Sequence, residues 1–122
     1  WRNKMKREIL FRGKTSDNKW IEGYLFKSWN DSYILWGTTN GVPDMTEVQS
    51  NTVGQYVGMD DIQDKRIFEN DIIKTRDGIG YIKFNKSTLR YEIITNHWDL
   101  PFDEIGSEIE IIGNIYDNGD LL

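Results

Sequence analysis

The sequence predicts a mainly β protein, a small antiparallel barrel or sandwich with little helix. Short runs rich in β-branched and aromatic residues recur at close spacing, and turn-prone pairs such as Asn40-Gly41 and Asp77-Gly78 separate most of them. Apolar residues rarely repeat with the 3.6-residue period of a helix. The runs expected to form strands are Glu8–Arg12, Lys19–Lys27, Ser32–Trp36, Thr52–Val57, Ile67–Thr75, Gly80–Asn85, Leu89–Thr95 and Glu108–Tyr116.

The clearest hairpin signal is Asp77-Gly78, which lies between Ile72–Lys74 and Tyr81–Phe84. Asp and Gly tolerate the positive φ angles that a tight turn requires. Apolar and polar side chains alternate within Tyr81–Phe84 and again within Leu89–Ile93. Each of these strands is therefore expected to have one buried face and one solvated face.

Two segments lack a strand pattern. Thr38–Ser50 is the most polar and least patterned stretch, so we expect an exposed loop there. A single helical turn is expected over Phe102–Ile105, because proline suits the first position of a helix and Pro101 precedes this segment. The residues expected in the core are Ile9, Phe11, Tyr24, Phe26, Val57, Ile67, Ile72, Tyr81, Phe84, Ile93, Ile111 and Ile115.

The length of 122 residues fits one domain, residues 1–122, which can subdivide into two lobes of about residues 1–58 and 59–122. The chain has no cysteine, which excludes disulfides, thiolate zinc sites and cysteine nucleophiles, and fits a reducing compartment. No apolar run reaches the length that spans a bilayer. We therefore expect a cytoplasmic protein of a bacterial cell, without a membrane partner.

The charge is unevenly distributed. The net charge is −5, which does not favour nucleic-acid binding by the chain as a whole. Residues 1–20 nevertheless carry seven basic and two acidic side chains, whereas residues 99–122 carry seven acidic and no basic ones. The two ends are expected to pair or to be solvated. The alternative is a basic N-terminal arm that meets an anionic partner or an acidic patch on another subunit.

Patterns that indicate catalysis or metal binding are weak. His97 is the only histidine, and a lone histidine is most often structural or exposed. Five carboxylates crowd one segment without the spacing of an EF-hand, so a solvated turn is expected there. They are Asp60, Asp61, Asp64, Glu69 and Asp71, of which Glu69 with Asp71 is the one pair worth testing for acid–base chemistry.

Gly78–Gly80 lacks the third glycine and the helix of a dinucleotide site. The sequence predicts no enzyme, metal, cofactor or small-molecule substrate.

Aromatic residues are abundant in the first third of the chain. Trp20, Tyr24 and Phe26 would line one face of a strand, and such stripes are usually buried. Trp29 lies beside a turn, and Trp98 flanks a polar loop, so either could be a surface anchor.

Four motifs occur in order along the chain: Arg7–Lys14 (REILFRGK), Thr52–Gly58 (TVGQYVG), Arg66–Ile73 (RIFENDII) and Ile109–Asn118 (IEIIGNIYDN). In this order and spacing they resemble the YopX-like proteins of bacteriophages and prophages, from Lys6 to Leu122. The resemblance implies one YopX-like domain, mostly β, with a small SH3-like barrel from about Ile67 onward. It implies no activity and no active-site residues.

Two positions depart from the pattern of this family, which usually has glycine where this chain has Asp64 and Asn70. Both look like turn positions. Asp and Asn are the residues that best replace glycine in a left-handed backbone conformation. The turn geometry is therefore expected to survive both substitutions.

We expect a phage or prophage accessory protein that acts as a non-catalytic interaction module and binds a protein partner or copies of itself. The opposed charges of the two ends would suit head-to-tail self-association into a homo-oligomer. The alternative is a small β-barrel that binds single-stranded nucleic acid through basic and aromatic side chains. The candidate binding residues are Lys6, Arg7, Arg12, Lys14, Trp20, Trp29 and Trp98.

Overall fold

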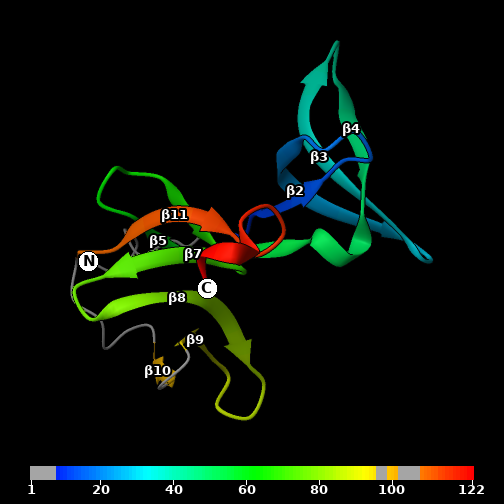
Figure 1. The fold of residues 1–122 in the computed structure, drawn as a ribbon. Coiled ribbons are helices and arrows are strands. Elements are labelled where there is room, and N and C mark those ends of the chain that lie inside the picture. The colour runs from blue at the N-terminus through cyan, green and yellow to red at the C-terminus, as the bar shows by residue number, and fades with distance from the viewer. Residues whose placement is uncertain (1–7, 96–98, 102–107) are drawn as a thin grey trace, which may run out of the picture. The chain divides into compact units, whose positions relative to one another are not determined.

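The computed structural model describes residues 8–95, 99–101 and 108–122. The chain divides into two compact units, Trp1–Gly58 and Met59–Leu122 (Figure 1). The described residues form strands and two single-turn 3-10 helices, η2 (Ser50–Thr52) and η4 (Gly119–Leu121), with no α-helix among them. The mainly β prediction is confirmed. The predicted helical turn at Phe102–Ile105 lies outside the described residues.

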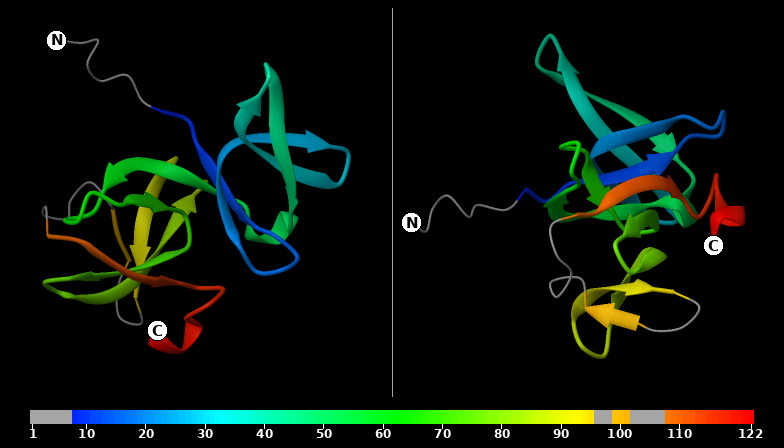
Figure 2. Two further views of the ribbon diagram at one scale, coloured as in Figure 1. Left: turned by 90° about the horizontal axis from the view of Figure 1, so that it is seen from above. Right: turned by 60° about the vertical axis from the view of Figure 1, so that its left-hand side comes forward.

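The first antiparallel sheet has the strand order β4-β3-β2-β1-β5-β6. Its strands are β1 (Phe11–Lys14), β2 (Trp20–Ser28), β3 (Asp31–Thr39), β4 (Val42–Val48), β5 (Gly54–Asp60) and β6 (Arg66–Phe68). β5 passes from the first unit into the second, where β6 follows it. Figure 2 shows the long hairpins of the first unit in blue to cyan.

β4 contradicts the predicted loop at Thr38–Ser50. Asn40 and Gly41 have φ angles of 52° and 80°. These angles close a two-residue turn, so Val42 pairs with Thr39 and a strand follows. The strand was hard to recognise because β4 lies at the end of the sheet and contains Pro43, which is typical of edge strands.

The second antiparallel sheet has the strand order β10-β9-β8-β7-β11. Its strands are β7 (Asp71–Thr75), β8 (Gly78–Asn85), β9 (Arg90–Ile94), β10 (Asp99–Pro101) and β11 (Glu110–Asn114). The strands at the ends of each sheet have one neighbour apiece, so the described strands form open sheets and not closed barrels. The SH3-like likeness of the second half stays a prediction.

The predicted β7–β8 hairpin is confirmed, with its turn one residue earlier than expected. Thr75 pairs with Gly78, so the loop consists of Arg76 and Asp77. Gly78 has a φ of 138°, which only glycine adopts easily. The left-handed positions are also confirmed, since φ is 62° at Asp64 and 71° at Asn70.

Most of the fully buried apolar side chains of the described residues lie in the second unit, and Ile34 is the one in the first unit. The buried apolar side chains of the second unit are Ile67, Phe68, Ile72, Ile73, Ile82, Ile93 and Ile109, whereas those of the first unit are Leu10, Ile34, Val48, Tyr56 and Val57. Among the predicted core residues, the buried ones are Val57, Ile67, Ile72 and Ile93, and the half-buried ones are Phe11, Tyr81, Phe84, Ile111 and Ile115. The prediction is wrong for Ile9, Tyr24 and Phe26, which are exposed.

Candidate functional site

An exposed patch of large side chains lies on one face of β2, β3 and β4. Tyr24 on β2 is opposite Leu35 on β3, which in turn is opposite Met45 on β4. Phe26 is opposite Tyr33. Residues directly opposite each other in antiparallel strands point to the same side of the sheet. We call these five residues the aromatic face.

The aromatic face is open to solvent at its centre. The exposed fraction is 62% for Tyr24, 47% for Phe26 and 53% for Met45. Tyr33 and Leu35 are half-buried, and the rings of Phe26 and Tyr33 lie 6.2 Å apart between centroids, tilted by 47°. Cross-strand ring pairs at this separation hold each other in position. The side chains therefore form a continuous apolar surface.

The opposite side of these strands is the buried one. Leu25 is opposite Ile34, which is fully buried, and Ser32 is opposite Val48. Because side chains alternate along a strand, burial of the Leu25 side places Tyr24 and Phe26 outside. The predicted burial of the aromatic stripe is therefore wrong for Tyr24 and Phe26, whereas Trp20 is half-buried.

Two cations lie at one corner of this surface. Arg12 and Lys14 on β1 are opposite Glu22 and Trp20 on β2, respectively. The Arg12 guanidinium carbon lies 4.7 Å from the centroid of the Trp20 ring, and Lys14 Nζ lies 5.9 Å from it. Cations at these distances are attracted to the electron-rich ring face. The β1–β2 hairpin thus brings together three of the candidate binding residues, and we call Arg12 and Lys14 the basic corner.

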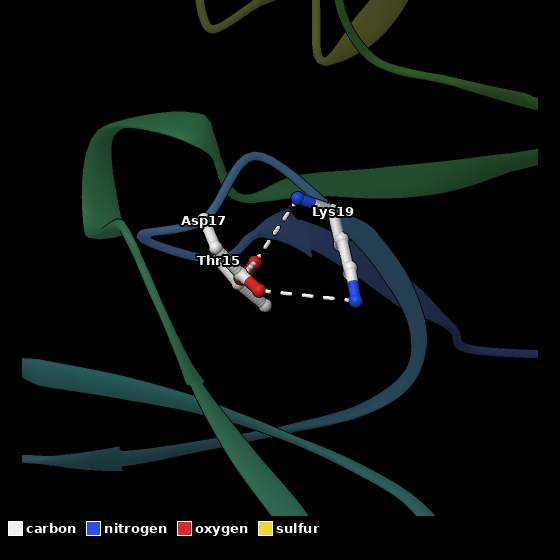
Figure 3. Close-up of polar contacts among 3 residues, drawn as sticks. All are labelled: Thr15, Asp17 and Lys19. Carbon is white, nitrogen blue, oxygen red and sulfur yellow. Dashed lines mark hydrogen bonds and ion pairs between the residues drawn. The ribbon is translucent and has the colours of Figure 1, made fainter.

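The loop between β1 and β2 is fixed by a small polar network (Figure 3). The Thr15 hydroxyl accepts a hydrogen bond of 3.0 Å from the Lys19 backbone N–H and donates one to the Asp17 carboxylate. Lys19 Nζ lies 3.9 Å from Asp17 Oδ2. The bond from Thr15 contributes most to a lowered pKa of Asp17. This loop sets the register of the hairpin that holds the basic corner.

Trp29 lies in the two-residue loop between β2 and β3. Its side chain is 93% exposed, and its φ of 55° is in the left-handed region. A residue with a Cβ costs roughly 1–2 kcal/mol in that region. The exposed indole recovers none of this cost by burial. Trp29 is therefore a strained, outward-facing residue at a hairpin tip.

The remaining candidates and the carboxylates give no further site. Lys6, Arg7 and Trp98, like His97, lie outside the described residues. Within the described residues, no group of three potential metal ligands occurs. Asp71 accepts a hydrogen bond of 2.8 Å from the Phe68 N–H, which is a structural contact.

Asp61, a buried carboxylate, has a structural role. It accepts hydrogen bonds from the backbone N–H groups of Gln63, Lys65 and Ile111 at 2.8, 2.9 and 3.1 Å. Burial acts to raise the pKa of Asp61, but the hydrogen bonds from Lys65, Ile111 and Gln63 outweigh it, so the pKa lies below its ordinary value. The charged form ties the β5–β6 turn to β11.

Sequence reasoning missed the aromatic face, because Tyr24 and Phe26 were expected in the core and Tyr33, Leu35 and Met45 were not candidates. It also missed Glu47. Glu47 is exposed on β4, opposite Tyr33 and on the same side of the sheet. The Asn40-Gly41 turn was the signal for β4. It would not have given the correct face, because the β3–β4 register shifts between Leu35 and Gly37. A shift of one residue moves every side chain to the other side.

The fold and the site define an all-β protein with two open antiparallel sheets and an exposed aromatic face. Residues 10–122 match the family described as YopX protein. The chain therefore belongs to the YopX family, and the resemblance seen in the four motifs is confirmed. No curated protein matches the chain. Among the described residues, no helix is long and apolar enough to cross a membrane.

Proposed function

We propose that this protein is a non-catalytic interaction module that binds a protein partner through the aromatic face. The observation that supports this most is the exposure of Tyr24, Phe26 and Met45 on one side of the sheet, with Leu35 between Tyr24 and Met45. Single exposed apolar residues are ordinary, but contiguous ones mark interaction sites. Tyr, Phe, Trp, Met and Arg are the residue types enriched at protein interfaces, and all five occur here.

Binding through the face is favoured over binding through the sheet edge. β4 lies at the end of the sheet order, where a partner strand could add. Pro43 lacks a backbone donor, and Asp44 and Glu47 add two negative charges to this short strand. Prolines and charges of this kind are how proteins prevent edge-to-edge pairing.

The alternative function is binding of single-stranded nucleic acid. The observation that favours it is the basic corner beside Trp20, because cations and rings together suit phosphates and bases. Two exposed acidic residues on the same side, Glu22 and Glu47, oppose it, as does the net charge of −5. The protein-binding function is therefore the better supported of the two.

The proposed setting is the cytoplasm of a bacterial cell that carries the phage or prophage, where the protein acts as an accessory factor. The absence of cysteine and the kinship with YopX proteins support this setting. The SH3-like barrel of the second half belongs to the same proposal.

The proposal can be tested with a photo-reactive phenylalanine analogue at position 26, in cells that naturally express the chain. Ile79 on β8 is a matched control position, because it is a strand residue with a similar exposed fraction, 40% against 47%. We expect a protein adduct at position 26 and none at position 79. In a parallel gel filtration at two salt concentrations, an oligonucleotide mixture should elute separately. If the protein co-elutes with the oligonucleotides at low salt and position 26 gives no protein adduct, the proposal is contradicted and the alternative is favoured.

A further inference from the structure

The far half of the β3–β4 hairpin extends beyond the rest of its sheet. The pairing of β3 with β2 ends at Leu35, opposite Tyr24. The pairing of β3 with β4 continues to Thr39 and Val42. Figure 1 shows this two-stranded ribbon projecting past β2. We call residues 36–46 the arm.

One side of the arm continues the buried side of the sheet into solvent. The indole Nε1 of Trp36 donates a hydrogen bond of 3.0 Å to the Thr46 hydroxyl, and Thr46 is opposite the fully buried Ile34. Asp44 is two residues from Thr46 on β4 and therefore points to the same side, whereas Met45 points to the aromatic face. The Trp36 side chain is 54% exposed. An exposed ring and a carboxylate therefore lie on the side of β4 opposite the aromatic face.

The space between this ring and this carboxylate is open. Gly37 follows Trp36 and is opposite Asp44. A Cβ added at Gly37 would meet only Asp44 Oδ2, at the ordinary contact distance of 3.8 Å. Gly37 does not have a left-handed backbone, and the extra residue of the strand irregularity is Trp36. Glycine within a strand also marks places where a ligand approaches closely. The lack of a side chain at Gly37 gives a ligand access to both groups.

The charge of Asp44 is not balanced within the described residues. The Thr39 hydroxyl donates a hydrogen bond of 2.8 Å to Asp44 Oδ2, which holds the carboxylate in place but carries no charge. Asp44 makes no ion pair with any described residue. The sequence between Lys27 and Lys65 contains six acidic residues and no basic one. The arm therefore favours a cationic ligand.

We propose that the Trp36–Asp44 side of the arm binds an arginine side chain of a partner protein. A guanidinium group stacks on an indole ring and donates hydrogen bonds to a carboxylate through its planar fork, which a lysine ammonium lacks. The ring is bonded to Thr46, about 7 Å along β4 from Asp44, so one guanidinium reaches both groups. The inference goes beyond the proposed function, because this second site does not depend on the aromatic face.

A peptide titration tests the chemistry of the site. The probe is a capped glycine–arginine–glycine tripeptide at low salt, and the readout is the NMR signal of the Trp36 indole N–H, which Trp36→Phe identifies. We expect a saturating shift with a dissociation constant on the order of millimolar, because exposed cation contacts are individually weak. The lysine tripeptide should bind at least about threefold more weakly, and the neutral citrulline tripeptide should not bind. Equal binding of the lysine peptide, or no shift up to about 20 mM arginine peptide, would overturn the inference.

Two variants and a matched control separate binding from folding. Asp44→Asn keeps an oxygen for the Thr39 hydroxyl but removes the charge, so it should weaken binding about tenfold or more. Gly37→Val fills the open space and should abolish binding, while valine's higher strand preference keeps the thermal stability equal or higher. Thr38→Val is the control, because Thr38 is opposite Pro43 on the other side of the arm, and it should bind as the wild type does. Unchanged affinity in Asp44→Asn would overturn the site, and this variant decides alone if Gly37→Val fails to fold.

A cross-linker on the same side of the arm tests whether the arginine belongs to a protein. Val42 is 64% exposed and lies two residues from Asp44 on β4. A photo-reactive phenylalanine analogue at position 42 should give a protein adduct in cells that naturally express the chain, and Asp44→Asn should remove this adduct. No adduct, or one that persists in Asp44→Asn, would overturn the assigned partner.

The two proposals fail independently. An adduct at position 26 without peptide binding at Trp36 would overturn the arginine site and leave the function of the aromatic face intact. Peptide binding and an Asp44-dependent adduct at position 42, without an adduct at position 26, would support the arginine site and contradict binding through the aromatic face.

Discussion

The two units of the molecule use their apolar residues differently. In the second unit, aliphatic side chains such as Ile72 and Ile82 are fully buried. Among the described residues of the first unit, only the apolar side chain of Ile34 is buried as completely, while Tyr24 and Phe26 face solvent. Burial of apolar surface is the main favourable contribution to folding, whereas an exposed ring contributes little to it. The second unit therefore has the larger stabilising core, and the first unit carries the surface that we propose binds a partner.

Shortening a buried side chain of the second unit should have the largest effect on the free energy of unfolding. Ile72→Ala should lower the free energy of unfolding by about 2–5 kcal/mol, because it leaves a cavity among fully buried side chains. Ile111→Ala, at a half-buried position on the neighbouring strand, should cost less. Urea denaturation of both variants makes the comparison. Equal shifts of the two midpoints would contradict the assigned burial.

Asp61 should contribute a smaller, pH-dependent stabilisation. Asp61→Ala leaves three backbone N–H groups without their acceptor, which should cost about 1–3 kcal/mol at neutral pH. The pKa of Asp61 is lowered in the folded state. Its contribution is therefore fully present above the unfolded-state pKa of about 3.9 and is lost as the pH falls through the lower folded-state pKa.

The measurement is urea denaturation of the wild type and Asp61→Ala over the same pH series. The difference between their free energies of unfolding should become smaller as the pH falls. A difference that stays constant down to strong acid would show that the charge of Asp61 does not contribute.

The two hairpin loops of the first unit allow a matched exchange. The β3–β4 loop has Asn40 and Gly41 at positive φ, whereas the β2–β3 loop has Trp29 there. Trp29→Asn should raise the free energy of unfolding by about 0.5–1 kcal/mol, because asparagine tolerates the left-handed region. Asn40→Trp should lower it by a similar amount. Thermal unfolding would compare the two variants, and a destabilised Trp29→Asn would show that the indole contributes to the fold.

Much of the fold was predictable because turns and strand alternation are local. The Asp77-Gly78 signal and the left-handed positions at Asp64 and Asn70 need only a few residues to be recognised. The buried side of β2 was not predictable, because Tyr24 and Leu25 are both apolar and alternation alone does not choose between them.

The candidate site was predicted less completely, since its assembly depends on register. Residue type alone predicts Arg12, Lys14 and Trp20 as candidates, and the β1–β2 pairing places them together. The Met45 and Glu47 positions depend on the irregularity between Leu35 and Gly37, which no turn signal specifies.

The most direct test of the account is a double variant, Tyr24→Thr with Phe26→Thr, examined for both unfolding and association. Threonine keeps a high strand preference, and the exposed rings contribute little burial, so the free energy of unfolding at low concentration should change by less than about 1 kcal/mol. Association with a protein partner should be lost. A variant that unfolds much more easily would place the rings in the stabilising core, and one that associates as tightly as the wild type would show that the aromatic face is not the binding surface.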